Sequence, residues 1–383
     1  MPGYASASEL AYQEAVKKAK KELRPRSKPE DWNANDYYHT FPPVAGEDNI
    51  LRMTKPTQEE FDNAVRAKNI PCLMLGIIDD WPARQEWTIE RLTKRFPDQK
   101  FKVGDKDGGG SIRMKLKYFT RYMYKNMDDS PMNVFDAGFG NRSKVRRLLC
   151  DVKPLPYFIP DFYKVSERKK IPPHRWFIIG PRRSGTNIHV DPLGSSAWNA
   201  LLEGVKLWCL FPPNTPRHIL KPKLGITNNP DAAITWFTQV YPLLRKRPYC
   251  DIYTPTVCLQ RAGEVMYVPS GWWHVVLNTE DTVAITENFI DKFNFEKCIE
   301  KCIKSRPSFL RQWINRMYMS YPDFMAKFNG KYDFLREKNG DNTSDSDTSD
   351  SDSSDSDSSD SSLEYIPPRK KPMTFFGVLD ATS

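Results

Sequence analysis

The sequence predicts a mainly β fold, a barrel or a sandwich with added helices, from two observations. Aromatic residues make up 13% of the 383 residues and include ten tryptophans, which suits the bulky interior of a β fold better than a solvated helical repeat. Seven strand-like segments also follow one another between residues 186 and 288. With 39% apolar residues, the chain can bury a large core, so we expect one large domain with helical additions, or two moderate ones.

The first segment, residues 1–48, is predicted to be a basic N-terminal arm. It carries the run K-K-A-K-K-E-L-R-P-R-S-K-P, which indicates a short helix followed by a chain broken by prolines. One interpretation is a solvated arm, and the others are a nuclear-import signal or a contact with nucleic acid. The sequence leaves these alternatives open.

Residues 49–170 are predicted to be an α/β part that supports the barrel. Thr57 and Glu60 can form a capping box at the start of a helix, and Thr88 can cap a second helix. Between them, I-P-C-L-M-L-G-I-I indicates a buried strand. The glycines at 108–110 lack the G-K-[S/T] ending of a phosphate loop, so we interpret them as a turn between two strands.

Residues 171–290 are predicted to form the barrel itself. Its strands are expected at 186–191, 197–202, 205–211, 256–260, 264–268, 272–278 and 282–288. A segment rich in proline and asparagine, residues 212–255, interrupts them. Because long insertions at a barrel mouth are more often functional than idle, we expect a lid or a substrate-binding loop there.

Residues 291–340 are predicted to be helical, because apolar residues recur there at i, i+3, i+4 and i+7. We expect these helices to pack on the barrel or to pair with another copy of the chain, giving a homo-oligomer. Residues 341–383 form a Ser/Asp-rich tail with too few apolar residues to bury surface, so we expect disorder. Serines flanked by aspartates are suited to phosphorylation by acidophilic kinases, and the basic cluster that follows Pro367 is typical of nuclear import.

The charge of the chain is unevenly distributed. The net charge is +9, but residues 341–364 contain eight Asp, one Glu and no Lys or Arg. The rest of the chain therefore holds 57 basic and 39 acidic residues, a net charge of +18. A protein this basic is expected to work near anionic partners, such as RNA, chromatin or anionic lipid.

Targeting and cysteine signals favour a soluble intracellular protein. No run approaches the ~18 apolar residues of a membrane span, and residues 1–10 lack an apolar secretory core. The seven cysteines are odd in number and irregularly spaced, which favours reduced thiols over a disulfide framework. Cys298 and Cys302 could share a helix face, but with no second pair nearby they do not indicate a zinc site. We expect the nucleus as the location.

Candidate metal ligands occur in the strand-like run T-N-I-H-V-D. His189 and Asp191 stand two apart, and in a strand residues i and i+2 project from the same face. His274 can supply a third ligand from a second strand-like run. Two histidines and one carboxylate are the ligand set of non-haem Fe(II) oxygenases. The alternative is a chance pair, because five histidines among many acids make an isolated H-x-[D/E] pattern common.

Other polar residues near the proposed ligands favour the metal. Lys206 lies in the next strand-like run, and Thr186 and Thr286 lie in strand-like segments beside the ligands. A lysine and hydroxyl groups could bind the far carboxylate of 2-oxoglutarate while its keto-acid end chelates the iron. Two acids expected near the mouth, Asp136 and Glu287, could hold the ammonium of a lysine substrate.

Two long strings carry a resemblance to a known family. Residues 176–212, which begin W-F-I-I-G-P-R-R-S-G-T-N-I-H-V-D, and residues 263–278, G-E-V-M-Y-V-P-S-G-W-W-H-V-V-L-N, resemble the JmjC-domain 2-oxoglutarate oxygenases. The resemblance extends from about residue 32 to about residue 313. It implies a double-stranded β-helix, a cupin-like jelly roll, with Fe(II) held by His189, Asp191 and His274 and with O2 as the oxidant.

The resemblance also implies how the co-substrate and the substrate are bound. It implies 2-oxoglutarate bound by Lys206, Thr186 and Asn199, with Thr286 contacting substrate or co-substrate. Asn133 stands where we expect a tyrosine near the co-substrate, so one hydrogen bond to 2-oxoglutarate is replaced or lost.

The implied activity is 5-hydroxylation of lysine side chains in Lys/Arg-rich nuclear proteins, namely splicing factors and histone tails, with arginine demethylation as a second activity. Two other functions stay open. One is a module that binds RNA or chromatin through the basic surface. The other is a phosphatidylserine-binding protein that acts in the clearance of apoptotic cells.

Overall fold

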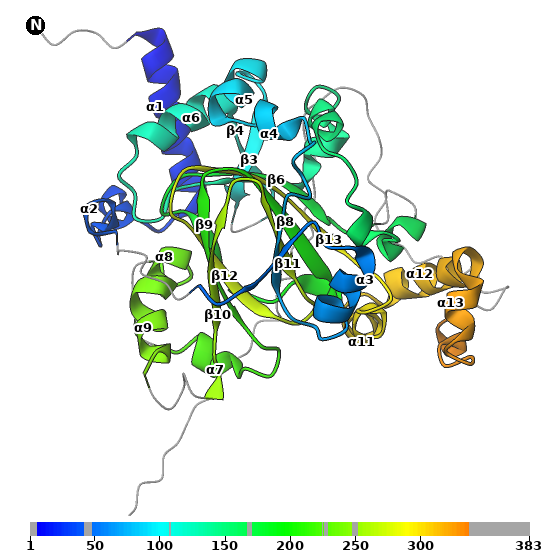
Figure 1. The fold of residues 1–383 in the computed structure, drawn as a ribbon. Coiled ribbons are helices and arrows are strands. Elements are labelled where there is room, and N and C mark those ends of the chain that lie inside the picture. The colour runs from blue at the N-terminus through cyan, green and yellow to red at the C-terminus, as the bar shows by residue number, and fades with distance from the viewer. Residues whose placement is uncertain are drawn as a thin grey trace, which may run out of the picture.

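A computed structural model of the chain describes residues 6–41, 48–106, 109–166, 171–223, 225, 229–246 and 252–336. It contains two large β-sheets with helices packed around them (Figure 1). The predictions about residues 341–383, their phosphorylation and their basic cluster lie outside the described residues.

The two sheets face each other and enclose a shared interior. The larger sheet has the strand order β1-β2-β11-β8-β13-β6-β5, and the smaller has the order β10-β9-β12-β7. Interior side chains come from both, for example Met266 from the larger sheet and Trp208 and Val276 from the smaller. β1 pairs with β2 in parallel, and the other described neighbours are antiparallel. The predicted mainly β jelly roll, a double-stranded β-helix with added helices, is confirmed.

The strands of the larger sheet are β1 (Leu51–Thr54), β2 (Cys72–Leu75), β5 (Val134–Asp136), β6 (Arg175–Gly180), β8 (Ser196–Glu203), β11 (Glu264–Val268) and β13 (Thr282–Phe289). Those of the smaller sheet are β7 (Gly185–His189), β9 (Val205–Phe211), β10 (Thr256–Arg261) and β12 (Trp273–Asn278).

Strand β8 shows why the central strands lack an alternating pattern. It lies between β11 and β13 and is buried along almost its whole length. Its outward side chains, Trp198 and Leu202, join the N-terminal core, whereas Ala197 and Leu201 face the interior between the sheets. A strand that is covered on both faces needs apolar residues at nearly every position. Asn199 is therefore exceptional as a polar residue that faces the interior.

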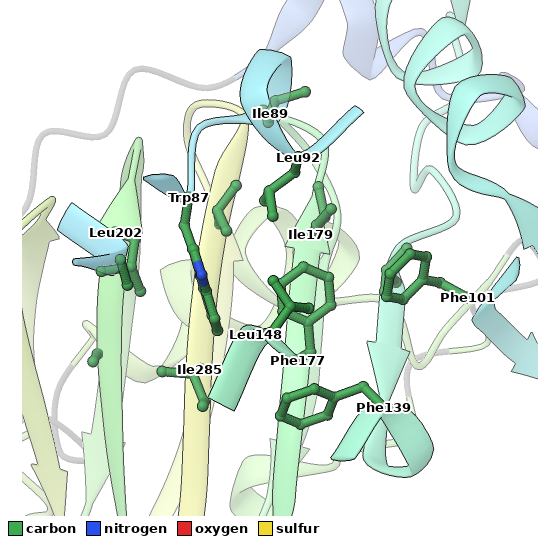
Figure 2. Close-up of a cluster of buried hydrophobic side chains, with 14 of the residues drawn as sticks. Trp87, Ile89, Leu92, Phe101, Phe139, Leu148, Phe177, Ile179, Leu202 and Ile285 are labelled. Atoms are coloured by element: carbon green, nitrogen blue, oxygen red, sulfur yellow. The ribbon is translucent and has the colours of Figure 1, made fainter. Parts of the chain in front are cut away.

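The outer face of the larger sheet is covered by the N-terminal α/β part. Figure 2 shows Trp87 and Leu92 from this part lying against Phe177 and Ile285 of the sheet. The elements that form this layer are α3 (Gln58–Phe61), η2 (Asp62–Arg66), α4 (Ala83–Glu86), α5 (Ile89–Arg95), β3 (Lys100–Asp105), β4 (Ser111–Lys115), α6 (Leu116–Lys125), η3 (Ala137–Asn141), η4 (Val145–Asp151) and η5 (Pro156–Phe158), whereas η6 (Phe162–Val165) packs with the C-terminal helices.

Local signals in this part are confirmed. The Thr57 N–H donates to Glu60 Oε2 at 2.8 Å and the Glu60 N–H donates to Thr57 Oγ1 at 3.2 Å, which completes the capping box. The Arg91 N–H donates to Thr88 Oγ1 at the start of α5. Gly109 and Gly110, both with φ +92°, lie in the turn between β3 and β4.

Of the interpretations left open for the basic N-terminal arm, the solvated arm does not hold for α1 (Ala7–Leu23). This helix packs on α6 and on the β3–β4 hairpin, and its Tyr12 and Ala19 are buried in the core. Lys20 Nζ donates to Asp128 Oδ1 at 2.6 Å and lies over the Trp32 ring. Part of the basic charge thus attaches the helix to the fold. The short elements η1 (Pro29–Trp32) and α2 (Tyr37–Thr40) follow.

The insertion at residues 212–255 was expected to be a lid or a substrate-binding loop, and much of its described part forms a cap on a sheet face. It forms α7 (Arg217–Leu220), α8 (Ala233–Thr235), η9 (Trp236–Val240) and α9 (Tyr241–Leu244). Ile234 and Trp236 pack against Leu207 and Leu277, which project from the outer face of the smaller sheet. The insertion therefore covers an apolar sheet face that would otherwise be exposed to water.

The C-terminal helices pack on the barrel, which is one of the two predicted arrangements. They are α11 (Phe295–Ser305), α12 (Pro307–Ser320) and α13 (Pro322–Ala326), followed by η10 (Asp333–Leu335). Their apolar faces share a core with η6 and lie against the short turn η8 (Pro192–Gly194). Cys298 and Cys302 are buried within this core with their sulfur atoms 3.7 Å apart. No helix in the described ranges has the length and apolar character of a membrane span.

Candidate metal centre and co-substrate pocket

A β-bulge in β7 brings two predicted site residues to the same face. Across the β7–β12 pair, His274 opposes His189 and Val276 opposes Thr186. Two residues along β12 thus span the same length as three residues along β7. The strand β7 therefore contains one extra residue, which forms the bulge. Without this bulge, the period of two would place Thr186 and His189 on opposite faces of the strand.

Asp191 completes the metal site from the chain that follows β7. Its Oδ1 lies 3.9 Å from His189 Nε2 and 4.0 Å from His274 Nε2. All three ligand atoms lie within 4.8 Å of one another, and no other group of three such residues is found among the described residues. Ligand atoms bonded at about 2 Å to one ion lie roughly 3–4 Å apart. The three side chains therefore fit a single metal ion after small movements.

The hydrogen bonds of the two imidazoles direct the same ring nitrogen toward the site. Nδ1 of His189 lies 2.7 Å from Asn187 O, and Nδ1 of His274 lies 3.1 Å from Trp272 O. Each Nδ1 donates to a carbonyl, so each Nε2 keeps its lone pair for a metal. Burial and the neighbouring His274 imidazole lower the pKa of His189. His189 is therefore neutral at physiological pH, the form that binds metals.

Lys206 lies at the opposite end of the same interior. It pairs with Asn278 across β9 and β12, whereas His274 pairs with Leu210 four positions away. At 3.3 Å per residue the two pairs are roughly 13 Å apart along the strands. Lys206 is only 4% exposed, and burial lowers its pKa to about 7. Within the described part of the chain, no carboxylate forms an ion pair with it.

Two buried groups of the interior have no partner of the needed kind among the described residues. A bound dicarboxylate would supply the anion for Lys206, and its waters could donate a hydrogen bond to Asn199. Lys206 is a buried cation without a charged partner among the described residues, and Asn199 Oδ1 is buried without a hydrogen-bond partner. Unsatisfied buried polar groups are costly, so such groups commonly mark a ligand site. An iron ion at the triad and 2-oxoglutarate between the triad and Lys206 fit these residues.

The other predicted contacts line this interior. Thr286 on β13 pairs with Asn199 on β8, and its hydroxyl donates to Trp198 O at 2.8 Å. Asn133 directly precedes β5 and stands two residues before Phe135, whose ring stacks on Trp176 beside the interior cluster. By strand alternation Asn133 shares the interior face with Phe135.

The two acids expected at the mouth lie elsewhere. Asp136 is fully buried, accepts from the Gly138 N–H and pairs with Arg142. Glu287 faces outward, where Arg175 donates to it at 2.7 Å. Each acid follows directly after an interior-facing residue of its strand, so alternation places it on the other face. The expectation that they hold a substrate lysine is wrong.

Sequence reasoning missed Asn278 and Trp208. Asn278 Oδ1 accepts from Lys206 Nζ at 2.7 Å. Trp208 lies beside His274 with ring centroids 6.0 Å apart, and its Nε1 donates to Gln260. The strand period of two could have predicted that both face the interior. Asn278 is four residues after His274, and Trp208 is two after Lys206.

Comparisons with known proteins agree with this site. The family described as "JmjC domain, hydroxylase" matches residues 176–289, which include the three ligand residues and Lys206. The bifunctional arginine demethylase and lysyl-hydroxylase psr-1 of Caenorhabditis briggsae is 42% identical over 332 residues, covering 86% of this chain and 84% of the relative.

Two further relatives extend the comparison. The protein of the same name in Caenorhabditis elegans is 42% identical over 313 residues, covering 81% of this chain and 78% of its own length. The 2-oxoglutarate and iron-dependent oxygenase JMJD4 of Danio rerio is 24% identical over 245 residues, 60% of this chain and 57% of the relative.

Proposed function

Since this chain belongs to the JmjC-domain family of iron- and 2-oxoglutarate-dependent oxygenases, we propose that it hydroxylates lysine side chains of proteins at carbon 5. The observation that carries the proposal is the placement of two complementary groups in one interior. The metal-binding triad lies at one end, and the buried Lys206, which has no ion-pair partner among the described residues, lies at the other. The names of the nematode relatives, which include lysyl-hydroxylase, supply the substrate class.

Each interior residue has a proposed role in binding. His189 and His274 would hold the iron through Nε2, and Asp191 would hold it through its carboxylate. Lys206 would pair with the distal carboxylate of 2-oxoglutarate, with Thr186, Asn199 and Thr286 as hydrogen-bonding partners beside it. When bound, iron and 2-oxoglutarate supply the oxidation of a C–H bond by O2.

The remaining residues of the site exclude water and leave the metal accessible. Three ligands on one side of an ion leave its other positions open for co-substrate and O2. The apolar interior residues Trp208, Leu210 and Val276 form the wall beside His274. A dry wall strengthens the pairing of Lys206 with a carboxylate, because electrostatic interactions are stronger at low dielectric.

Arginine demethylation is the second candidate activity. The names of the nematode relatives include arginine demethylase. The same oxidation, applied to the N-methyl carbon of methylarginine, gives a hydroxymethyl group that leaves as formaldehyde. One site could thus carry out both reactions if it admits both side chains.

The proposed substrates are basic nuclear proteins, including splicing factors and histone tails, and the proposed location is the nucleus. The net charge of +18 outside residues 341–364 and the nuclear-import-like basic clusters support this proposal. RNA binding through the same charge would complement catalysis, and its affinity would fall steeply with salt. Contact with phosphatidylserine in apoptotic-cell clearance remains the alternative for an anionic partner.

A homo-oligomer is proposed through the C-terminal helices. Met319 and Phe334 are 82% and 73% exposed there, and exposed large apolar side chains are enriched at protein interfaces.

Mass spectrometry of lysine-containing and methylarginine-containing peptides tests the activity. The full chain is incubated with Fe(II), 2-oxoglutarate and O2. The gain of one oxygen atom on lysine supports hydroxylation, and the loss of a methyl group from methylarginine supports demethylation. His189→Ala should abolish both products together with succinate formation. Product formation by this variant would contradict the proposed site.

A further inference from the structure

The hydrogen-bond partner of the Lys206 ammonium and its register partner on the next strand are neutral. Its hydrogen-bond acceptor is the amide oxygen of Asn278, 2.7 Å away and only 1% exposed. Across β9 and β10, Lys206 opposes Gln260, which is also neutral. From the facing sheet, the interior residues Asn199, Leu201 and Ala284 are uncharged. The Asn278 amide thus holds the ammonium of Lys206 without neutralising its positive charge.

The amide of Asn278 has only one possible orientation. Ser184 Oγ donates its single hydrogen to Pro181 O at 2.6 Å, so toward Asn278, at 2.9 Å, it can only accept. The amide must therefore point its NH2 group at Ser184 and its oxygen at Lys206. The single hydrogen of the Ser184 hydroxyl thus fixes which way the Asn278 amide faces.

The backbone around Asn278 is built to fit this side chain. A Cβ atom at Gly180 would lie 2.1 Å from Asn278 Nδ2, so only glycine leaves room for the amide. The Asn278 N–H donates to Ser184 O and the Arg183 N–H donates to Asn278 O. The turn after β6 and the end of β12 are thus joined by both main-chain and side-chain hydrogen bonds.

We propose that Asn278, locked by Ser184, is a positioning residue that holds the Lys206 ammonium for the distal carboxylate of the co-substrate. The inference rests on the proposed role of Lys206 in binding 2-oxoglutarate. A carboxylate at position 278 would pair with Lys206 and compete with the co-substrate, and an alkyl group there would release the ammonium. The neutral, fixed amide does neither.

Binding of the co-substrate should change the protonation of Lys206. Burial lowers the pKa of Lys206 to about 7, and a carboxylate beside the lysine favours its charged form. Co-substrate binding at pH 8 should therefore be accompanied by uptake of a proton by Lys206. With Asn278→Asp, the lysine is already paired and charged, so this uptake should disappear.

Calorimetric titration of 2-oxoglutarate into the Mn(II)-loaded full chain, without O2 and in two buffers of different ionisation enthalpy, tests the proposal. N278D should weaken co-substrate affinity by about tenfold or more, the effect of losing a hydrogen bond to a charged group, and should abolish the proton uptake. Ser184→Ala should weaken the affinity by about threefold to tenfold, the effect of a neutral hydrogen bond. Mn(II) affinity should remain unchanged in both variants.

Thr282→Val is the matched control. Thr282 is fully buried at the same end of the barrel, and its hydroxyl also donates to a main-chain carbonyl, that of Gly180. T282V should lower stability like S184A but leave co-substrate affinity unchanged. Equal affinity losses in S184A and T282V, or wild-type affinity and proton uptake in N278D, would overturn the inference.

Lys206→Met separates this inference from the proposed function. If K206M binds 2-oxoglutarate like the wild type, the proposed role of Lys206 itself fails. If K206M loses binding while N278D and S184A retain it, only the positioning role of Asn278 fails.

Discussion

The buried charge of Lys206 lowers the free energy of unfolding of the co-substrate-free protein. Pairing with the carboxylate of the co-substrate would remove this penalty. Its pKa is lowered to about 7 by burial, whereas in the unfolded chain it is about 10.4. The unfolded chain therefore binds more protons between about pH 7 and pH 10, so the free energy of unfolding rises with pH across this window. The lysine destabilises the co-substrate-free protein most at and below pH 7.

Lys206→Met should consequently stabilise the co-substrate-free protein by roughly 1–3 kcal/mol at pH 7 while abolishing 2-oxoglutarate binding. Urea unfolding of both proteins at several pH values measures the difference. The advantage of the variant should be full below pH 7 and decline toward pH 10. A variant less stable than the wild type at pH 6 would contradict this explanation.

Substitution of Asn133 tests whether an added hydroxyl group increases the affinity for 2-oxoglutarate. If it stands where a tyrosine hydroxyl would reach 2-oxoglutarate, Asn133→Tyr should tighten co-substrate binding by roughly threefold to tenfold, the effect of one added hydrogen bond. Asn133→Phe adds the ring without the hydroxyl and should give no gain. Calorimetric titration of both variants distinguishes the hydroxyl from the ring, and an equal effect of the two would rule out the hydrogen bond.

For individual residues, the sequence predicted those site residues that follow the strand period of two or lie within a long motif. His189, Asp191 and His274 converge as expected. The placement of Asp136 and Glu287 failed because one step along a strand reverses the face, and composition does not show which face is buried. The bulge that brings Thr186 beside His189 is set by pairing with β12, so the local sequence alone did not indicate it.

Among the elements, the turn η8 connects the metal site to the C-terminal helices. Leu193 and Gly194 have φ of +57° and +69°, and a Cβ atom at Gly194 would lie 2.9 Å from Lys297 O, close to α11. Ser195 Oγ donates to Pro192 O and accepts from Asn288 Nδ2. This turn directly follows Asp191, so the C-terminal helices support a metal ligand.

Gly194→Ala should therefore disturb both stability and metal binding. Strain at positive φ and the contact with α11 should cost about 1–3 kcal/mol, and movement of Asp191 should weaken Mn(II) binding. Thermal unfolding and metal titration measure the two effects. Gly109, also at positive φ but with open space around it, is the matched control, since Gly109→Ala should leave metal binding intact. Unchanged Mn(II) affinity in G194A would contradict the link.

The elements that sequence reasoning misplaced are those whose position depends on distant partners. The helix α1 appeared to be a solvated arm, because its lysines conceal Tyr12 and Ala19, which pack on α6 and the hairpin. The packing of the insertion at 212–255 on the smaller sheet was not predicted, because nothing in its composition shows which sheet face it covers. Local caps such as Thr57 and Glu60 depend on neighbours in sequence and were predicted correctly.

For the whole molecule, charge is the main determinant of partner binding. Removing residues 341–383 takes away the acidic segment and leaves a protein with a strong positive net charge. We predict that this deletion increases affinity for heparin, with a steep loss of binding as salt rises. Retention on heparin at increasing salt measures the change. Equal retention of the full and shortened chains would show that the tail does not offset the basic surface.

Native mass spectrometry of the full chain with Fe(II) and 2-oxoglutarate, kept free of O2, shows whether this interior binds iron and the co-substrate together. We predict one iron and one 2-oxoglutarate bound per wild-type chain, iron without 2-oxoglutarate on K206M, and neither on Asp191→Ala. A wild-type chain that binds neither, or an Asp191→Ala variant that binds both, would contradict the assignment of this interior to iron and its co-substrate.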